Sequence, residues 1–311
     1  MTPVLAIDIG GTTIKIGVVT ARGEILRRSL VPFDATLQFD ALVEHIHAAC
    51  SALLAEPGLA PGRIAIATPG YSLPDSGRLV DGAGNVPALR GRSIRAALSE
   101  RFGLPASVEN DGIAAARGEL LFGAGRRFRR FVVITIGTGI GGAVVIDGLP
   151  IAGGNGEPPE IGAIVVGEAS RKAAATTLES CASAPALMEA YNRAAAKPVD
   201  SVEKIFAALD DGNLHAFEVI DRSCRNIAQA FGTLVNALGL DACVLGGGVS
   251  GAGAILGDRV RAHMPEFTWP LLMSRVEILI SSLGNDAALL GASANVRRKP
   301  DRVLAPLSSN G

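Results

Sequence analysis

The chain contains one kind of segment twice, IDIGGTTIKIGVV at residues 7–19 and ITIGTGIGGAVV at residues 134–145. Each segment runs from a β-branched strand through a turn rich in glycine and threonine into a second strand. A strand, turn and strand unit that recurs in this way indicates an internally duplicated architecture. The two copies therefore predict two similar lobes that enclose a cleft.

Strand-like and helix-like patterns alternate over the rest of the chain. β-Branched runs predict strands, and apolar residues three or four positions apart predict helices. The expected strands are at 4–10, 14–20, 24–32, 63–67, 106–109, 131–136, 142–146, 242–245 and 276–281, and the expected helices are at 37–55, 93–102, 112–122, over most of 178–238 and at 285–296. This alternation predicts an α/β fold with two lobes, 1–112 with 286–311 and 113–285, in which the last helix packs back onto the first lobe.

The composition is that of a globular protein. The chain has 311 residues, 48% of them hydrophobic, which suffices for about two domains with their own cores. Lysine and arginine total 29, while aspartate and glutamate total 30, so no net field attracts nucleic acid or an anionic membrane. We therefore expect small molecules and further copies of the chain as partners, with no nucleic acid and no membrane.

The cysteines and the N-terminal residues indicate in which cellular compartment the protein is expected. The four cysteines are scattered, with no CxxC pair and no spacing that resembles a disulfide framework. Residues 1–7 lack the basic and apolar regions of a secretory signal, and glycine and threonine interrupt the apolar stretch 131–146, which argues against a spanning helix. The expected localisation is cytoplasmic.

The first glycine turn has the composition of a phosphate-binding loop. Paired glycines let backbone N–H groups approach an anion, and hydroxyl groups and a lysine add donors and positive charge. Because the turn bends into a hairpin and does not open a helix, it is not a P-loop, and its aspartate is better placed than a Walker serine to hold hydrated Mg²⁺. An ordinary glycine hairpin would look the same. The candidate residues are Asp8, Gly10, Gly11, Thr12, Thr13 and Lys15.

Gly137, Thr138 and Gly139 form the second glycine turn. Its amides and hydroxyl would hold the other side of a triphosphate. A single glycine turn is weak evidence. Two turns in equivalent hairpins favour phosphate binding, because phosphoryl transfer needs positioning and charge stabilisation from both sides.

Two further segments each have a structural and a functional interpretation. Asn110 and Asp111 lie where a short strand meets a helix, so this aspartate is either part of a helix cap or a carboxylate that accepts a hydroxyl proton. Gly246, Gly247 and Gly248 follow a buried strand, where adenine or ribose would lie against the bare backbone. A strand-to-helix turn would have the same sequence, and spacing alone does not separate these alternatives.

In this order, the motifs resemble those of the ROK family of sugar kinases and sugar-responsive repressors, which has the actin-like (ribonuclease H-like) ATPase fold. The resemblance covers nearly the whole chain. Five further segments also match motifs of the family, although the pattern of their residues alone suggested no role. They are 68–70, 85–87, 159–162, 178–180 and 283–286.

The resemblance implies a two-lobed fold with a central cleft, in which the terminal phosphoryl group of ATP, carried with Mg²⁺, is transferred to a hexose or N-acetylhexosamine hydroxyl. It assigns Asp111 as the general base and suggests a homodimer or homotetramer. The residues that it assigns to the sugar are Gly70, Asn85, Asn110, Asp111, Glu160 and Glu179. Without the resemblance, the two glutamates would be taken as surface charges.

The chain departs from the family at a structural zinc site that many relatives have beside the sugar. Ala163 stands where those relatives have a histidine, and Cys181 alone cannot form a tetrahedral site. Between positions 165 and 178 the chain has no cysteine and offers Glu168, Ser170, Arg171 and Lys172. We therefore expect no structural zinc, and the identity of the sugar stays open.

Three functions follow. The leading one is an ATP-dependent hexose kinase, the second is a sugar-sensing regulator or binder, and the third is a kinase that uses polyphosphate. The first strand begins by Val4, which leaves no room before it for a helix-turn-helix and favours the enzyme over the regulator. Arg126, Arg127, Arg129 and Arg130 would guide polyphosphate if they lined the cleft, and otherwise they form a solvated turn.

Overall fold

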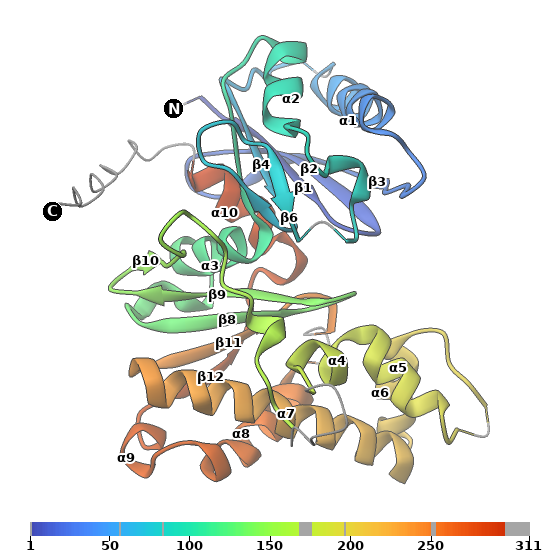
Figure 1. The fold of residues 1–311 in the computed structure, drawn as a ribbon, viewed down its shortest axis with the longest axis vertical. Helices are drawn as coiled ribbons and strands as arrows, with labels where there is room; N and C mark the ends of the chain where they lie inside the picture. The colour runs from blue at the N-terminus through green and yellow to red at the C-terminus, as the bar shows by residue number, and fades with distance from the viewer. Residues whose placement is uncertain are drawn as a thin grey trace, which may run out of the picture.

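The protein consists of two α/β lobes in the computed structural model, which describes residues 2–55, 57–82, 84–167, 176–195, 197–249 and 253–295. In Figure 1 one lobe lies above the other, and each has its own sheet. Within the described ranges, none of the helices combines the length and the apolar character that crossing a bilayer requires. The predicted α/β class and the two-lobed arrangement are confirmed.

The upper lobe is built on a five-stranded sheet with the order β3-β2-β1-β4-β7. Its strands are β1 (Val4–Ile9), β2 (Thr13–Val19), β3 (Ile25–Pro32), β4 (Arg63–Thr68) and β7 (Ala106–Asn110). β1 pairs antiparallel with β2 and parallel with β4, and every residue of β1 is buried. Because β1 is the central strand and is covered on both faces, its end fixes the position of the first glycine turn.

One face of the upper sheet is covered by α1 (Phe39–Leu54) and α2 (Ile94–Phe102). Leu5, Ile7 and Ile9 of β1 alternate along the strand and pack against these helices. The lobe is completed by a 3-10 turn (Pro87–Leu89) and a small hairpin of β5 (Tyr71–Ser72) and β6 (Leu79–Asp81).

The lower lobe repeats this arrangement of strands. Its strands are β8 (Phe131–Ile136), β9 (Ile140–Ile146), β10 (Leu149–Pro150), β11 (Ala242–Gly246) and β12 (Glu277–Ile280), in the order β10-β9-β8-β11-β12. β8 pairs antiparallel with β9 and parallel with β11, as β1 pairs with β2 and β4. The two sheets share their strand order and directions, which confirms the predicted duplication.

β9 starts at Ile140, two residues earlier than the sequence pattern indicates. Ile140 and Gly141, which the pattern left outside the strand, pair with Ile136 and Thr135 of β8, and β9 packs against α3 (Asp111–Leu121). A Cβ atom on Gly142 would overlap the carbonyl oxygen of Val133, and one on Gly112 would lie 2.6 Å from the nitrogen of Gly142. The glycine at 142 therefore serves close packing and not the turn.

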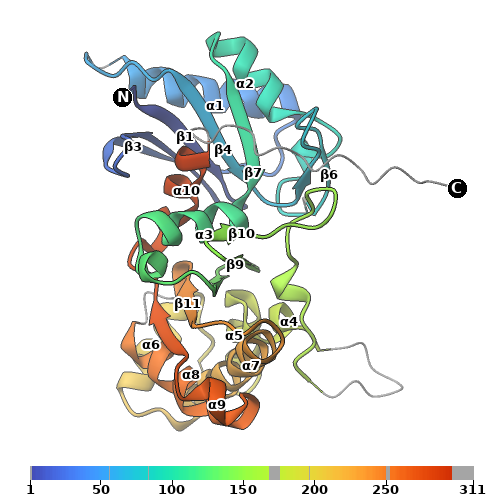
Figure 2. The ribbon, with the colours of Figure 1, turned by 90° about the vertical axis from the view of Figure 1, so that its left-hand side faces the viewer.

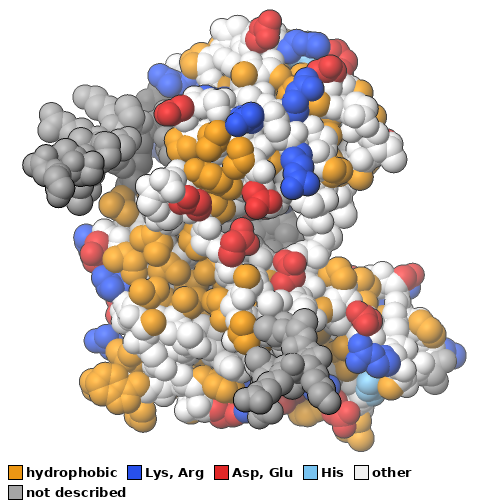
Figure 3. All heavy atoms as spheres, in the orientation of Figure 1, with side chains coloured by type: hydrophobic (Ala, Val, Ile, Leu, Met, Phe, Trp, Pro, Cys, Tyr) orange, Lys and Arg blue, Asp and Glu red, His pale blue; other side chains and the backbone are white. Residues whose placement is uncertain are grey.

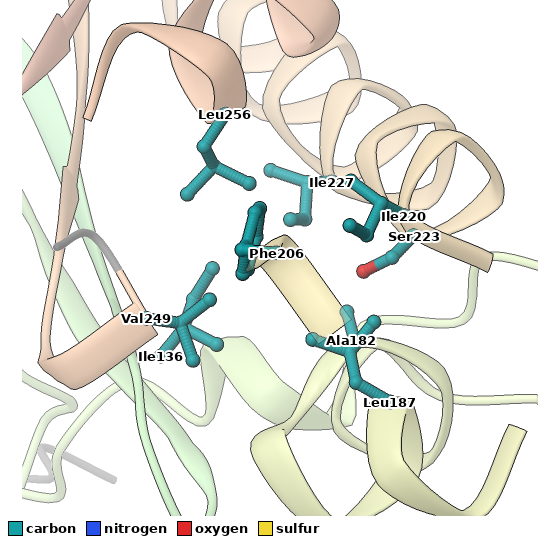
Figure 4. Close-up of a pocket in the computed structure, with 9 residues that line it drawn as sticks. All are labelled: Ile136, Ala182, Leu187, Phe206, Ile220, Ser223, Ile227, Val249 and Leu256. Carbon is teal, nitrogen blue, oxygen red and sulfur yellow. The ribbon is translucent and has the colours of Figure 1, made fainter. Parts of the chain in front are cut away.

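Helices cover the lower face of the second sheet. They are α4 (Leu178–Ala182), α5 (Ala184–Asn192), α6 (Val202–Asp210), α7 (Leu214–Leu238), α8 (Ala254–Phe267) and α9 (Pro270–Met273). Figure 4 shows side chains from α4 to α8 around a small space, with Ile136 from the end of β8 and Val249 at one side of it. The space between them does not admit a water molecule, so this region is a packed core and not a ligand site.

α3 and α10 (Ala287–Asn295) cross each other between the two sheets (Figures 1 and 2). α10 packs on β1 and β4 of the upper sheet, while α3 packs on β8 and β9 of the lower sheet. Cβ atoms on Gly118 and Gly291 would overlap backbone carbonyl oxygens of the opposite helix, so the crossing requires glycine at both positions. The predicted return of the last helix to the first lobe is confirmed.

We propose to keep the lobe boundaries at 1–112 with 286–311 and at 113–285, although the first boundary falls within α3, which contacts both lobes. Of the first lobe, residues 296–311 lie outside the described part of the chain. The last helix begins at Ala287 and not at 285, because Gly284–Asp286 forms a 3-10 turn.

Candidate active site

The ends of β1 and β8 face each other across a cleft of about 490 Å³ between the lobes. In Figure 3 acidic side chains gather at the waist of the molecule, where the lobes meet. The predicted site residues that line the cleft are Asp8, Gly10, Gly11, Lys15, Gly70, Asn85, Asn110, Asp111, Gly137, Thr138, Gly139, Glu160, Glu179, Gly247 and Gly248. The chain regions that sequence reasoning selected thus meet in one place.

The first glycine turn contains an ion pair. The Lys15 ammonium lies 2.8 Å from the carboxylate of Asp8, which is only 5% exposed. Gly10 donates a hydrogen bond of 3.1 Å to the carbonyl oxygen of Thr13, which closes the turn. Thr13 and the exposed Thr12 lie outside the lining of the cleft. The turn therefore offers bare glycine backbone flanked by one positive and one negative group.

The second glycine turn is supported from outside the hairpin. Within the turn, Gly137 donates a hydrogen bond of 2.9 Å to the carbonyl oxygen of Gly139. The backbone N–H of Ile140 donates to the Glu179 carboxylate of α4 at 2.7 Å, and the N–H of Ala184 at the start of α5 donates to the carbonyl oxygen of Gly137 at 2.9 Å. Helices far along the chain thus fix the position of this turn.

Asn110 caps α3, and Asp111 is the first residue of that helix. The Asn110 side-chain oxygen accepts hydrogen bonds from the backbone N–H groups of Gly112 and Ile113 at 2.9 and 3.2 Å, and its amide nitrogen donates to the carbonyl oxygen of Gly70 at 3.1 Å. Because Asn110 performs the capping, the carboxylate of Asp111 is left to face the cleft.

The environment of Asp111 raises its pKa to about 6. Burial at the bottom of the cleft is the largest cause, and the negative charge of Asp8 adds to it. A hydrogen bond from the N–H of Gly112 and the positive charge of Lys15 oppose these effects. A carboxylate with such a pKa is mostly ionised at neutral pH but accepts a proton more readily than an ordinary aspartate.

Glu109 of the same triplet turns away from the cleft. Its carboxylate lies 3.2 Å from the guanidinium of Arg117 on α3, and both side chains are almost fully buried. Burial raises the pKa of Glu109, and the charge of Arg117 opposes the rise. The pair joins β7 to α3 next to Asp111, and neither of its residues lines the cleft.

Glycines bring the remaining sugar candidates close to the first turn. Gly70 has a φ of +83°, and a Cβ atom there would overlap the carbonyl oxygen of Asp81. A Cβ atom on Gly11 would lie 2.9 Å from the Cβ atom of Asn85. Asn85 therefore packs directly against the first turn, while Glu160 lines the opposite side of the cleft from the lower lobe.

Sequence reasoning missed the loop before α10 as part of the site. Gly284, Asn285, Ala287 and Ala288 line the cleft, although the segment 283–286 was noted only as a motif without a role. The Ser281 hydroxyl accepts hydrogen bonds from the N–H groups at 283 and 284, at 3.2 and 2.8 Å, and itself donates to the buried Glu119 carboxylate of α3. Only this contact between distant residues reveals the role of the loop.

Two other predicted segments lie outside the cleft. Gly246 ends β11 one residue before the lining begins. The basic run 126–130 is also absent from the lining: Arg127 pairs with Glu277, and Arg130 pairs with Asp147 at 3.3 Å. The arginines form a turn on the lower lobe, so their position provides no path for a polyphosphate chain.

The carboxylates that line the cleft are those of Asp8, Asp111, Glu160 and Glu179. Among the residues that the structure describes, no three histidine, cysteine, aspartate or glutamate side chains gather closely enough to hold a metal ion. Mg²⁺ bound to nucleotide phosphates needs only one or two carboxylates, and Asp8 provides one at the first turn. Glu168, Ser170, Arg171 and Lys172, which the segment without cysteine offers, lie outside the described part.

Comparison with known proteins agrees with this geometry. The model described as ROK family matches residues 4–299. The glucokinase of Halalkalibacterium halodurans is 30% identical over 96% of this chain and 96% of its own, and the beta-glucoside kinase of Klebsiella pneumoniae is 29% identical over 93% and 94%. A ROK family glucokinase from Streptomyces griseus, solved in complex with glucose and AMPPNP, has a TM-score of 0.82 at 28% identity over 94% of this chain and 98% of its own.

These matches confirm the resemblance that the motifs indicated, together with the predicted actin-like fold of two lobes around a cleft. They span nearly the full length of this chain and of its relatives. The chain belongs to the ROK family.

Proposed function

We propose that the chain is an ATP-dependent sugar kinase, which transfers the terminal phosphoryl group of ATP to a hydroxyl of a hexose or an N-acetylhexosamine. The observation that carries the proposal is the meeting of two glycine turns and the Asp111 carboxylate in one cleft. Relatives named glucokinase and beta-glucoside kinase, and the related structure with glucose and AMPPNP, support it.

The two turns bind the triphosphate from opposite sides. Backbone N–H groups at Gly10, Gly11 and Gly137–Gly139 are the donors, because glycine lets the phosphate oxygens approach the backbone. Asp8 is the carboxylate that would hold hydrated Mg²⁺ carried with the nucleotide, and such an ion would neutralise part of the charge on the phosphate oxygens. Lys15, paired with Asp8 at 2.8 Å, places a positive charge beside the first turn, where it would also contact a phosphate oxygen.

Gly247 and Gly248 lie at the edge of the cleft after β11, where the nucleoside follows the phosphates. Their lack of side chains lets adenine or ribose rest on the backbone. Gly246, which precedes them, supports this contact from the strand end.

Asp111 is the general base. The sugar hydroxyl oxygen forms a bond to the terminal phosphorus, the bond from that phosphorus to the bridging oxygen breaks, and the hydroxyl proton passes to Asp111. The nucleoside diphosphate leaves with the electrons of the broken bond. A raised pKa suits this late proton transfer, since the carboxylate is ionised at neutral pH and still basic enough to accept the proton.

The remaining polar side chains recognise the sugar. Glu160 and Glu179 accept hydroxyl hydrogens, and Asn85 offers both a donor and an acceptor. Asn110 has used its oxygen twice in the cap and one N–H on the carbonyl oxygen of Gly70, so it has a single N–H left for the sugar. A set of directed hydrogen bonds of this kind discriminates sugars by the orientation of their hydroxyls.

The experiment that tests the proposal is coupled turnover of a sugar panel with Mg-ATP and, separately, with polyphosphate. The panel contains glucose, mannose, fructose, allose, N-acetylglucosamine, N-acetylmannosamine and cellobiose. Turnover of at least one sugar with Mg-ATP is the expected result, and it identifies the acceptor. Sugar binding by calorimetry without any turnover would replace the kinase by a sugar-sensing binder.

We further propose that the enzyme acts in the cytoplasm as a homodimer or homotetramer, without nucleic-acid or membrane partners. The near balance of 29 basic and 30 acidic residues supports a small-molecule enzyme. Light scattering on the purified full chain measures the assembly directly.

A further inference from the structure

Glu179 contacts the second glycine turn as well as the cleft. Its Oε2 atom accepts the backbone N–H of Ile140 at 2.7 Å, directly after the turn. A Cβ atom on Gly139 would lie 2.7 Å from the same oxygen, and one on Gly162 would lie 3.4 Å from it. The carboxylate therefore lies between two glycines, and any side chain at 139 would displace it.

The helix that presents this carboxylate is itself held in place. At the start of α4, Ser180 donates its backbone N–H to the Thr177 hydroxyl at 3.3 Å, and Thr177 donates its backbone N–H to the Ser180 hydroxyl at 3.0 Å. The N–H of Leu178 donates to the carbonyl oxygen of Ile164 at 2.8 Å. The position of Glu179 is thus set by backbone contacts and not by its own flexibility.

The second oxygen of Glu179 is available to a ligand. Glu179 lines the cleft, and within the described ranges its Oε1 atom has no hydrogen-bond partner. The two oxygens thus differ: Oε2 accepts the N–H that follows the second glycine turn, and Oε1 has no partner among the described residues although the side chain lines the cleft.

We infer that Glu179 is a positioning residue that couples the two substrates: its Oε2 fixes the second phosphate-binding turn, and a sugar hydroxyl on its Oε1 immobilises the carboxylate and so the turn. The inference rests on the proposed function and deepens it. A sugar that has already ordered the turn lowers the entropic cost of nucleotide binding, so each substrate tightens the binding of the other.

The first test is the affinity for Mg-AMPPNP without any sugar, measured by calorimetry for the wild type, Glu179→Gln and Glu179→Ala. Both variants remove the same charge, but only the glutamine retains an oxygen that accepts the N–H of Ile140. We expect the alanine variant to bind Mg-AMPPNP about 2- to 10-fold more weakly than the glutamine variant, as loss of one hydrogen bond predicts.

The matched control is Glu160→Ala. Glu160 lines the same cleft, and its carboxylate has no hydrogen bond within the described ranges. This variant should lose sugar affinity but bind Mg-AMPPNP without sugar as the wild type does. Melting temperatures of all variants without ligand establish that they fold.

The second test measures the coupling. With a saturating amount of the sugar that the wild type phosphorylates, Mg-AMPPNP should bind the wild type about 5- to 150-fold more tightly than without sugar. This gain should disappear in Glu179→Ala. Equal Mg-AMPPNP affinity of the alanine and glutamine variants without sugar would overturn the inference. So would a loss of Mg-AMPPNP affinity without sugar in Glu160→Ala as large as that in Glu179→Ala.

The two tests separate this inference from the proposed function. If the wild type turns over no sugar, the kinase proposal fails, while the difference between the alanine and glutamine variants still reports whether Glu179 fixes the turn. If the wild type turns over a sugar and that difference is absent, the kinase proposal stands and the positioning role of Glu179 is wrong.

Discussion

The two glycine turns occupy equivalent places in two sheets of identical strand order, but they are supported in different ways. The first turn has its charges in its own hairpin, where Asp8 on β1 pairs with Lys15 on β2. The second hairpin has no charged residue between 134 and 145 and depends on Glu179 and Ala184 from the helices that follow. Duplication preserved the backbone frame, whereas each copy acquired its own means of fixing the turn.

The largest effect on turnover should come from replacing Asp111, which lines the cleft between the two turns and belongs to neither. Asp111→Asn should lower kcat about 10²- to 10⁴-fold, because it removes the proton acceptor from the cleft. Sugar and Mg-AMPPNP affinities should change little. Steady-state kinetics with calorimetry measure both, and retained turnover would remove Asp111 from the role of base.

Stability provides the control for this variant. The folded-state pKa of Asp111, about 6, lies above its ordinary value of 3.8, so ionisation of this carboxyl costs the folded state stability as pH rises through about 6. At pH 8 Asp111→Asn should therefore be more stable than the wild type, by on the order of 3 kcal/mol. At pH 4 the difference should vanish, as chemical denaturation at both pH values would show.

A smaller effect should follow from a change in the first turn alone. Asp8→Asn removes the carboxylate proposed to hold hydrated Mg²⁺ and should lower kcat/KM for Mg-ATP about 10- to 100-fold. The loss should be partly recovered at high Mg²⁺ concentration. A Mg²⁺ titration decides the point, since a loss that is independent of Mg²⁺ would place the metal elsewhere.

The pH dependence of turnover tests whether the charge of Asp8 in the first turn raises the pKa of Asp111. Because Asp111 must be ionised to accept a proton, kcat/KM for the sugar, which reports the pKa values of the free enzyme, should be level above pH 7 and fall about tenfold per pH unit well below pH 6. Asp8→Asn removes a negative charge that raises the pKa of Asp111, so its acid limb should move to lower pH. An acid limb at the same pH in wild type and variant would contradict this electrostatic link.

The smallest effect should be on stability, when alanine replaces one glycine in each turn. In Gly11→Ala the new methyl group meets the Cβ atom of Asn85 at 2.9 Å, which should lower the free energy of unfolding by about 1–3 kcal/mol. Gly137→Ala has no atom within 4 Å of the new Cβ and should be near neutral. Chemical denaturation of the two variants compares them directly, and equal losses would mean that both turns are equally crowded.

Local signals account for what could be predicted from the sequence. The β-branched run before the second turn predicted β8 with the bounds that the structure has, and Ser93 and Phe102 bound α2 closely as expected. Asp8 and Lys15 were candidates because they flank a glycine turn. Asp111 was a candidate because it lies where a strand meets a helix. Such features depend on a few consecutive residues, so a single sequence contains them.

Contacts between distant residues account for what could not be predicted. β9 begins two residues earlier than expected because Ile140 and Gly141 pair with Ile136 and Thr135 of β8, and the place of Asn285 in the cleft follows from Ser281 and the buried Glu119. The second task of Glu179, support of the turn, requires a hydrogen bond across 39 positions. The sequence shows these residue types but not their proximity.

The crossing of α3 and α10 has a consequence for the order in which the chain folds during synthesis. The face of the upper sheet opposite α1 and α2 is covered by α10, which is translated only after the whole lower lobe. Until then that face is open to the ribosome's surroundings. The sheet contributes Ala6, Ala65 and Ala67 to this face, beside Val4, Val19 and Ile25, and the three alanines reduce the apolar area through which nascent chains aggregate before the last helix arrives.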